Sequence, residues 1–95
     1  MKNVSLLRET LATIKANPEH WNQESWHCGT THCFAGFAEL IVRQLPFAVE
    51  PHTEDTAAFA RSALGITFRE AEALFRASNT LRDLDFMVNI LCADD

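Results

Sequence analysis

The chain has 95 residues, of which 47% are hydrophobic and 22% charged, values typical of one folded globular domain without a disordered linker. Its net charge of −5 falls within residues 48–95, where four arginines stand against nine acids, and such an acidic half disfavours direct binding to DNA or RNA. Three cysteines and the lack of a long apolar run argue against a secreted disulfide scaffold and a membrane span, so we expect one cytoplasmic domain over residues 1–95.

The first predicted helix runs from about Val4 to Ala16. Its apolar residues recur at helical spacing on one face, and Asn17-Pro18 ends it, because a residue before proline avoids the helical conformation. The apolar face comprises Val4, Leu7, Leu11 and Ile14.

The second predicted helix spans about residues 31–44 and stops near Pro46. Nearly all of its circumference is apolar, apart from a polar strip of His32, Glu39 and Arg43. A helix of this kind belongs in the middle of a domain, so we expect it to be the central element.

Three more helices are predicted in the second half. The first covers about Glu54 to Leu64, with Thr53 as its N-terminal cap and Gly65 as its C-terminal stop. The next opens with the capping box Thr67-Phe-Arg-Glu70 and buries Leu74 and Phe75. The last covers about residues 81–92 and buries Leu81, Leu84, Val88 and Leu91.

Phe86 and Ile90 lie on a different face of the last helix from this buried stripe. They either pack on the first helix or form an exposed apolar patch, and core packing is favoured in a domain this small. With no convincing strand pattern, the predicted fold is all-α: a compact bundle of about five short helices around the central helix at about 31–44.

Candidate chemistry concentrates in the stretch from Trp21 to Cys33. Imidazole and thiolate are the ligands that zinc prefers, so this stretch could hold a metal through His27, Cys28, His32 and Cys33, with His20 as a further candidate. All candidates lie in one short run, however, whereas zinc motifs usually place the second ligand pair on a distant element. If a helix begins at Thr31, His32 and Cys33 also point about 100° apart.

A second interpretation is thiol redox chemistry by Cys28 and Cys33. A thiol near a helix N-terminus can have a lowered pKa, and Gly29 could let the loop fold one cysteine back onto the other. The C-x4-C spacing nevertheless differs from the C-x-x-C motif of thioredoxin-like proteins, which follows a strand.

The favoured interpretation is structural. Trp21 and Trp26 would close the ends of the bundle, Cys33 would be a small core residue, and Thr30 or Thr31 would cap the central helix. In this interpretation the histidines at 20, 27 and 52 are surface residues.

Three segments of the chain stand out, namely Trp26…Cys28-Gly-Thr-Thr-His-Cys33-Phe-Ala-Gly-Phe-Ala38, Ala63-Leu-Gly-Ile-Thr67…Glu70-Ala-Glu-Ala-Leu-Phe75 and Asn79-Thr-Leu81. Together they resemble a family of small helical proteins from bacteria and bacteriophages for which no activity is established. The match covers about residues 21–91 and implies a shared fold but no reaction. Its Cys-Gly-Thr and Cys-x-Ala-Gly elements do not include the histidines, which weakens the metal interpretation. The turn at residues 64–67 also looks like the entrance to a helix-turn-helix unit, but acids on the next helix argue against DNA reading.

These observations favour a small protein-binding module over an enzyme, because phosphate-binding glycine loops and nucleophile or zinc-protease motifs are missing from the sequence. We expect a phage or mobile-element type regulator or inhibitor that contacts another protein, with no cofactor and no membrane or nucleic-acid partner. The alternatives are zinc binding within residues 27–33 and a redox role for Cys28 and Cys33. The candidate binding residues are Trp21, Trp26, Phe86 and Ile90.

Overall fold

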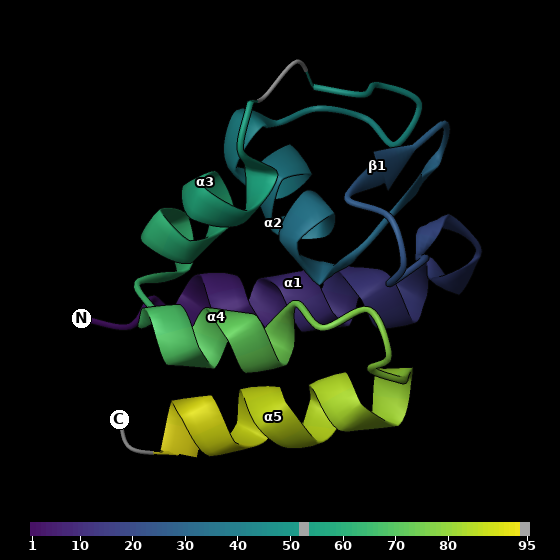
Figure 1. Ribbon diagram of the computed structural model, residues 1–95. Helices are drawn as coiled ribbons and strands as arrows, with labels where there is room; N and C mark the ends of the chain where they lie inside the picture. Colours follow the sequence, from purple (N-terminus) through teal and green to yellow (C-terminus); the bar gives the residue numbers. More distant parts are fainter. Residues whose placement is uncertain (52–53, 94–95) are drawn as a thin grey trace.

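The computed structural model describes residues 1–51 and 54–93 and is mostly helical (Figure 1). Within these ranges it contains five α-helices, one short 3-10 helix and one two-stranded sheet, so the expected helical bundle is confirmed in outline. The sheet was not predicted, and the fold is therefore not purely all-α. Among the described helices, none combines the length and apolar character that crossing a membrane requires.

Helix α1, Val4–Ala16, matches the predicted range. The side chain of Asn3 caps it by accepting a hydrogen bond from the Leu6 amide, and the chain leaves the helix at Asn17 before the 3-10 helix η1, Pro18–His20. Leu7, Leu11 and Ile14 are buried, as the apolar spacing predicted.

Helix α2, Phe34–Arg43, is the central helix and packs against both α1 and α3 (Figure 1). Every residue from Phe34 to Leu40 is buried. The helix begins three residues later than predicted, because Cys33 is its N-cap and its sulfur accepts a hydrogen bond from the Gly36 amide at 3.4 Å. Neither Thr30 nor Thr31 caps it.

Strands β1, His27–Cys28, and β2, Thr31–His32, form an antiparallel hairpin in place of the predicted start of α2. His27 pairs with His32 and Cys28 with Thr31, and Gly29 takes the left-handed conformation that the tight turn needs, with φ of 62°. The hydroxyl of Thr31 donates to the Cys28 carbonyl oxygen, at 2.9 Å, and so closes the turn instead of capping a helix.

The hairpin packs closely against the first turn of α2 at Gly36. A Cβ atom built at this position would lie 2.1 Å from the Trp26 carbonyl oxygen and 3.0 Å from the Cβ of His32. Only glycine permits this approach. The missing side chain thus fixes how the hairpin sits on the central helix.

Helix α3, Thr56–Leu64, ends at the predicted glycine, and helix α4, Phe68–Leu74, begins at the predicted capping box. Gly65 stops α3 with φ of 67°, and the capping box between Thr67 and Glu70 opens α4. The N-terminal cap of α3 is Asp55, whose carboxylate accepts from the Ala58 amide, while the predicted cap Thr53 lies outside the described residues.

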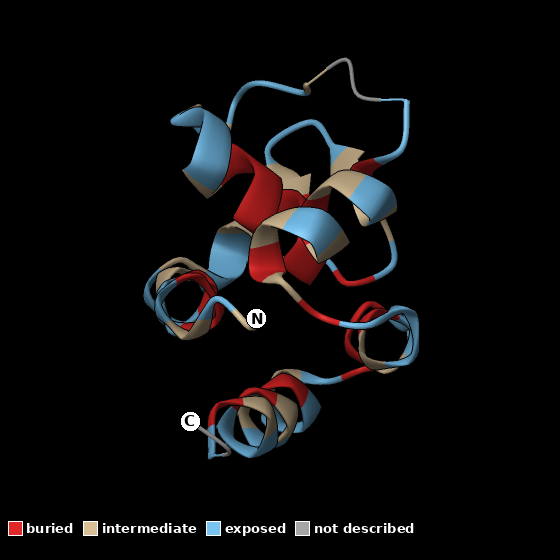
Figure 2. Cartoon of the chain, turned by 90° about the vertical axis from the view of Figure 1, so that its left-hand side faces the viewer, coloured by how far each residue is buried: buried red, intermediate tan, exposed pale blue. Residues whose placement is uncertain are grey.

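Helix α5, Leu81–Ala93, packs on α1 through its buried residues Leu84, Val88 and Cys92. Phe86 and Ile90 are 66% and 53% exposed, so the expectation that they join the core was wrong. Each follows a buried residue by two positions, which is about 200° around the helix and therefore on the opposite side. Figure 2 shows the buried residues of the helices turned toward the interior.

Candidate functional site

The Trp21–Cys33 stretch runs from the end of η1 through the hairpin to the cap of α2. Its histidines are not equivalent. His32 is completely buried, and the His27 side chain is only 8% exposed, so the expectation that His27 is a surface residue was wrong. His52, also expected at the surface, lies outside the described residues.

His27 and His32 form a continuous buried hydrogen-bonded chain with Glu39 of α2. The two Nδ1 atoms are 2.7 Å apart, and His27 Nε2 lies 2.8 Å from Glu39 Oε1. At the other end, His32 Nε2 lies 2.8 Å from the Phe47 carbonyl oxygen. We call His27, His32 and Glu39 the histidine–glutamate network.

Both ends of this network are acceptors, namely a carboxylate and a backbone carbonyl. Its three hydrogen bonds require three hydrogens, but two neutral imidazoles carry only two N–H groups. The network therefore holds one more proton than two neutral imidazoles and an ionised carboxylate, and its net charge is zero. Charge balance of this kind permits ionisable groups to remain buried.

His32 keeps its neutral form within the network. Burial lowers its pKa from the ordinary value of 6.5, and the positive charges of His27 and His20 act in the same direction, although the Phe47 carbonyl opposes them. The lowered pKa therefore disfavours a second proton on His32.

Glu39 ties the network to a second side chain of α2 and to α3. Its carboxylate also accepts from Arg43 Nε at 3.0 Å and from the Thr56 hydroxyl of α3 at 3.1 Å. Charge-assisted hydrogen bonds to a fully buried carboxylate are stronger than neutral ones. The predicted polar strip on the central helix is therefore an anchor that joins the hairpin to α2 and α3.

The remaining metal candidates do not join these two histidines. Cys28 is exposed on the hairpin, while Cys33 is buried at the helix cap. His20 stacks on Phe47 with ring centroids 4.3 Å apart, and its Nδ1 lies 2.8 Å from the Thr30 carbonyl oxygen. Among residues 1–51 and 54–93, no group of three or more His, Cys, Asp or Glu side chains is placed to hold a metal ion.

Cys33, one member of the redox candidate pair, is not an activated thiol. Burial raises the pKa of Cys33 to about 11, so at neutral pH this group is a thiol and not the nucleophilic thiolate. Cys28, Cys33 and Cys92 are all free in the structure, and only Cys28 is exposed.

The tryptophans have different surroundings. Trp21 packs against the core, and its indole N–H donates to the Gln23 side chain at 3.1 Å. Trp26 is 47% exposed and does not close the bundle as expected. Its ring meets Phe75 edge-on, with centroids 6.2 Å apart.

Trp26 forms one wall of an open groove of about 340 Å³ between α3 and α4. Phe68, which is 75% exposed, also lines this groove, and Arg61 lies over its ring with the guanidinium carbon 5.5 Å from the centroid. We call this surface the Trp26–Phe68 groove. The residues that give it its character are Trp26, Ala57, Arg61, Phe68, Glu72 and Phe75.

Phe68 was not among the predicted binding residues, although the sequence contains its signal. Phe68 and Phe75 are seven residues apart, which is two turns of a helix and the same face. Only Phe75 of this pair is covered, because Phe68 occupies the first turn of α4, where the chain has just left the core at Ile66.

Comparison with known proteins adds no relative: the chain matches no family model, no curated protein and no solved structure. The resemblance to bacterial and bacteriophage proteins stays a prediction.

Proposed function

We propose that this chain is a small non-enzymatic protein-binding module, a regulator or inhibitor of the phage or mobile-element type, and that it contacts its partner through the Trp26–Phe68 groove. The observation that carries the proposal is the pair of exposed aromatic side chains, Trp26 and Phe68, in the lining of one apolar groove.

Exposed aromatic residues at a groove are typical of binding sites. Tryptophan is enriched among the residues that dominate binding free energies, and apolar patches rimmed by charges mark protein contact sites. Here Asp55, Arg61 and Glu72 stand at the edges of the groove. A partner that inserts an apolar side chain would therefore find both a desolvated centre and a polar rim.

The buried polar groups support the same assignment by elimination. The hydrogen-bonding atoms of the histidine–glutamate network are engaged by one another, by the backbone and by the side chains of Arg43 and Thr56, and Cys33 is a buried thiol. These groups contribute to the fold, so the proposal places the partner at the groove and not at the buried polar groups.

The test is affinity capture from host lysate with the wild-type chain and with a Trp26→Ala, Phe68→Ser double variant. We expect a protein that is retained by the wild type and lost, by at least about tenfold, with the double variant. Val42→Ser is the matched control, because Val42 is an exposed apolar residue outside the groove. A retained set that is the same for all three chains would refute the groove as the contact surface.

A further inference from the structure

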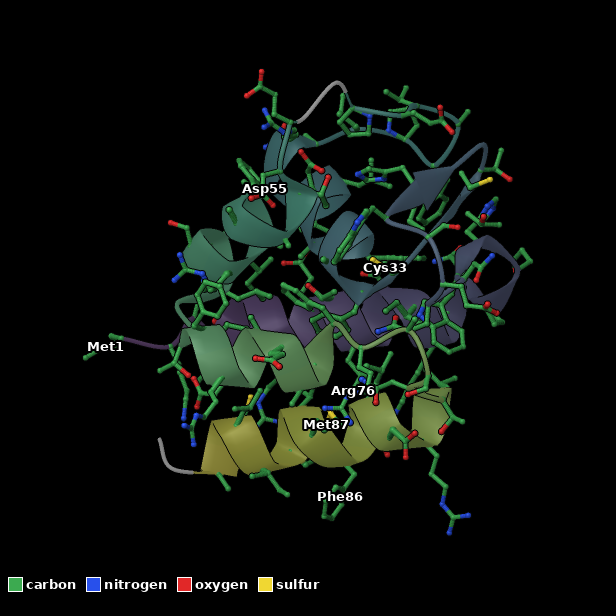
Figure 3. All side chains as sticks on the ribbon, viewed as in Figure 1. Met1, Cys33, Asp55, Arg76, Phe86 and Met87 are labelled. Carbon is green, nitrogen blue, oxygen red and sulfur yellow. The ribbon has the colours of Figure 1, made fainter. Side chains whose placement is uncertain are left out.

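The two histidines of the hairpin hold it against the rest of the molecule. His27 of β1 is hydrogen-bonded to Glu39 of α2, and His32 of β2 is hydrogen-bonded to the Phe47 carbonyl oxygen in the loop that follows α2. Strand β2 also runs directly into α2 through Cys33, which Figure 3 shows in the interior beside that helix. Strand β1 is thus held on α2 through a side chain, whereas β2 is continuous with the helix cap.

The closed network accommodates three hydrogens. One hydrogen lies in each of its three contacts, which join Glu39 Oε1 to His27 Nε2, His27 Nδ1 to His32 Nδ1, and His32 Nε2 to the Phe47 carbonyl oxygen. The second carboxylate oxygen of Glu39 already accepts from Arg43 Nε. A fourth proton taken up from solvent must therefore displace one of these hydrogen bonds.

The fourth proton goes to the histidine pair. Imidazole binds a proton about two pH units above a carboxylate, so acid charges the second imidazole before it neutralises Glu39. Both rings then carry a hydrogen on every nitrogen, and the two Nδ1 atoms, 2.7 Å apart, become facing donors. Because the two rings are also like charges with centroids 4.9 Å apart, the contact of His27 with His32 becomes repulsive.

The charged groups around the pair set how acidic the solution must be. The positive charges of Arg43 on α2 and His20 on η1 disfavour the additional proton, whereas Glu50, which accepts from the turn of the hairpin, favours it. Helix α3 contributes the neutral hydroxyl of Thr56. Burial of His32 adds to the opposition, so the proton enters at a pH below the ordinary histidine pKa of 6.5.

The ring that leaves the contact is His27. The additional hydrogen on His32 Nδ1 needs an acceptor, and water supplies one only at the position that the His27 ring now occupies. His32 keeps its hydrogen bond to the backbone carbonyl in either state, because Nε2 remains a donor. Glu39 keeps Arg43 and Thr56 as donors when His27 leaves, so its buried carboxylate is not left unpaired.

Movement of His27 also moves Trp26, which directly precedes β1. In the closed structure the Trp26 ring meets Phe75 edge-on, and the Trp26 carbonyl oxygen lies against Gly36. We propose that β1 is a proton-sensitive switch: a fourth proton on the histidine–glutamate network detaches β1 from α2 and withdraws Trp26 from the Trp26–Phe68 groove. The effect on binding rests on the proposed function, whereas the movement itself requires no partner.

Fluorine NMR of the full chain labelled with 5-fluorotryptophan tests the movement between about pH 7.5 and 5. The chain has two tryptophans, so two signals are expected, and Trp26→Phe assigns them. The Trp26 signal should shift toward its position in the urea-unfolded chain with a midpoint below pH 6.5, while far-ultraviolet circular dichroism retains the helical signal. Trp21 is the internal control, because it pairs with β2 at His32 and its indole N–H donates to Gln23, so its signal should stay in place.

A double variant separates the network from the remaining histidines. His20→Gln with His52→Gln leaves His27 and His32 as the only histidines of the chain and should preserve the Trp26 shift. In this variant the ring signals of the two histidines should titrate at the same pH at which the Trp26 signal moves.

A Trp26 signal that stays in place until the helical signal is lost would overturn the proposal. An equal shift of Trp21 would also overturn it, as would loss of the Trp26 shift in the double variant. Capture of a partner at pH 7.5, where the network is closed, tests the groove separately. Failure of the switch therefore leaves the test of the proposed function intact, and failure of capture leaves the fluorine experiment intact.

Discussion

Replacing Gly36 by alanine should destabilise the protein, although the same change in an open helix stabilises it. The new Cβ would lie 2.1 Å from the Trp26 carbonyl oxygen, and ordinary contacts begin near 3.4 Å, so the hairpin must retreat by about 1.3 Å. Hydrogen bonds of 2.7 and 2.8 Å within the histidine–glutamate network do not survive such a displacement.

The expected magnitude follows from three contributions. Overpacking costs about 1–3 kcal/mol, and loss of a hydrogen bond to a charged group costs about 1.5–3 kcal/mol. The better helix propensity of alanine offsets only about 1 kcal/mol of this loss of stability. We therefore expect a net loss of about 1.5–5 kcal/mol, which lowers the midpoint of urea unfolding by roughly 1–3 M at a slope of about 1.5 kcal/mol per M.

Urea unfolding followed by far-ultraviolet circular dichroism measures this loss, and Trp26 fluorescence should shift to longer wavelength as the hairpin moves. Gly29→Ala is the matched control, because nothing lies within 4 Å of its Cβ position and only the left-handed φ of 62° opposes the change, at about 1 kcal/mol. If Gly36→Ala instead stabilised the chain by about 1 kcal/mol, the close approach of hairpin and helix would be refuted.

Three further outcomes are expected. Gly65→Ala should cost at least about 1–2 kcal/mol in urea unfolding, because φ is 67° and the added Cβ would lie 2.2 Å from the Met1 carbonyl oxygen; unchanged stability would contradict this contact. A thiol reagent at pH 7.5 should label Cys28 in the native chain and Cys33 only after unfolding, because burial raises the pKa of Cys33 to about 11. Below pH 6.5 His32 is protonated in the unfolded chain, whereas its pKa is lowered in the native chain, so the free energy of unfolding should fall as the pH falls, by up to about 1.4 kcal/mol per pH unit. His32→Gln should flatten this slope between pH 6.5 and 5.5. An equal slope in the variant would contradict the lowered pKa of His32 in the native chain.

The ends of helices could be predicted from the sequence wherever the capping interaction joins residues that are close together in the chain. Asn17-Pro18 and Gly65 mark where α1 and α3 end, and the Thr67-x-x-Glu70 pattern marks where α4 begins, because each interaction joins residues within one turn of the helix. The central, buried position of α2 also followed, since its apolar residues surround the whole helix.

The hairpin and the histidine–glutamate network could not be predicted in the same way. Two-residue strands carry too little alternation to reveal a period of two, and the turn at Gly29 is recognisable only once the strands are known. The contact of His27 with Glu39 joins residues twelve positions apart on different elements. An isolated histidine looks the same in sequence whether it is solvated or buried, which is why His27 was assigned to the surface.

The hairpin links the buried network to the proposed binding surface. His27 points inward to Glu39, whereas Trp26 and Cys28 on either side of it are exposed. The Trp26 carbonyl is held against Gly36 at the same place, which fixes the backbone from which the indole ring projects. A binding residue held in place before association loses less conformational entropy when it binds. If Trp26 contacts a partner as proposed, the buried polar chain contributes to recognition without touching that partner, because it fixes the backbone from which Trp26 projects at the groove.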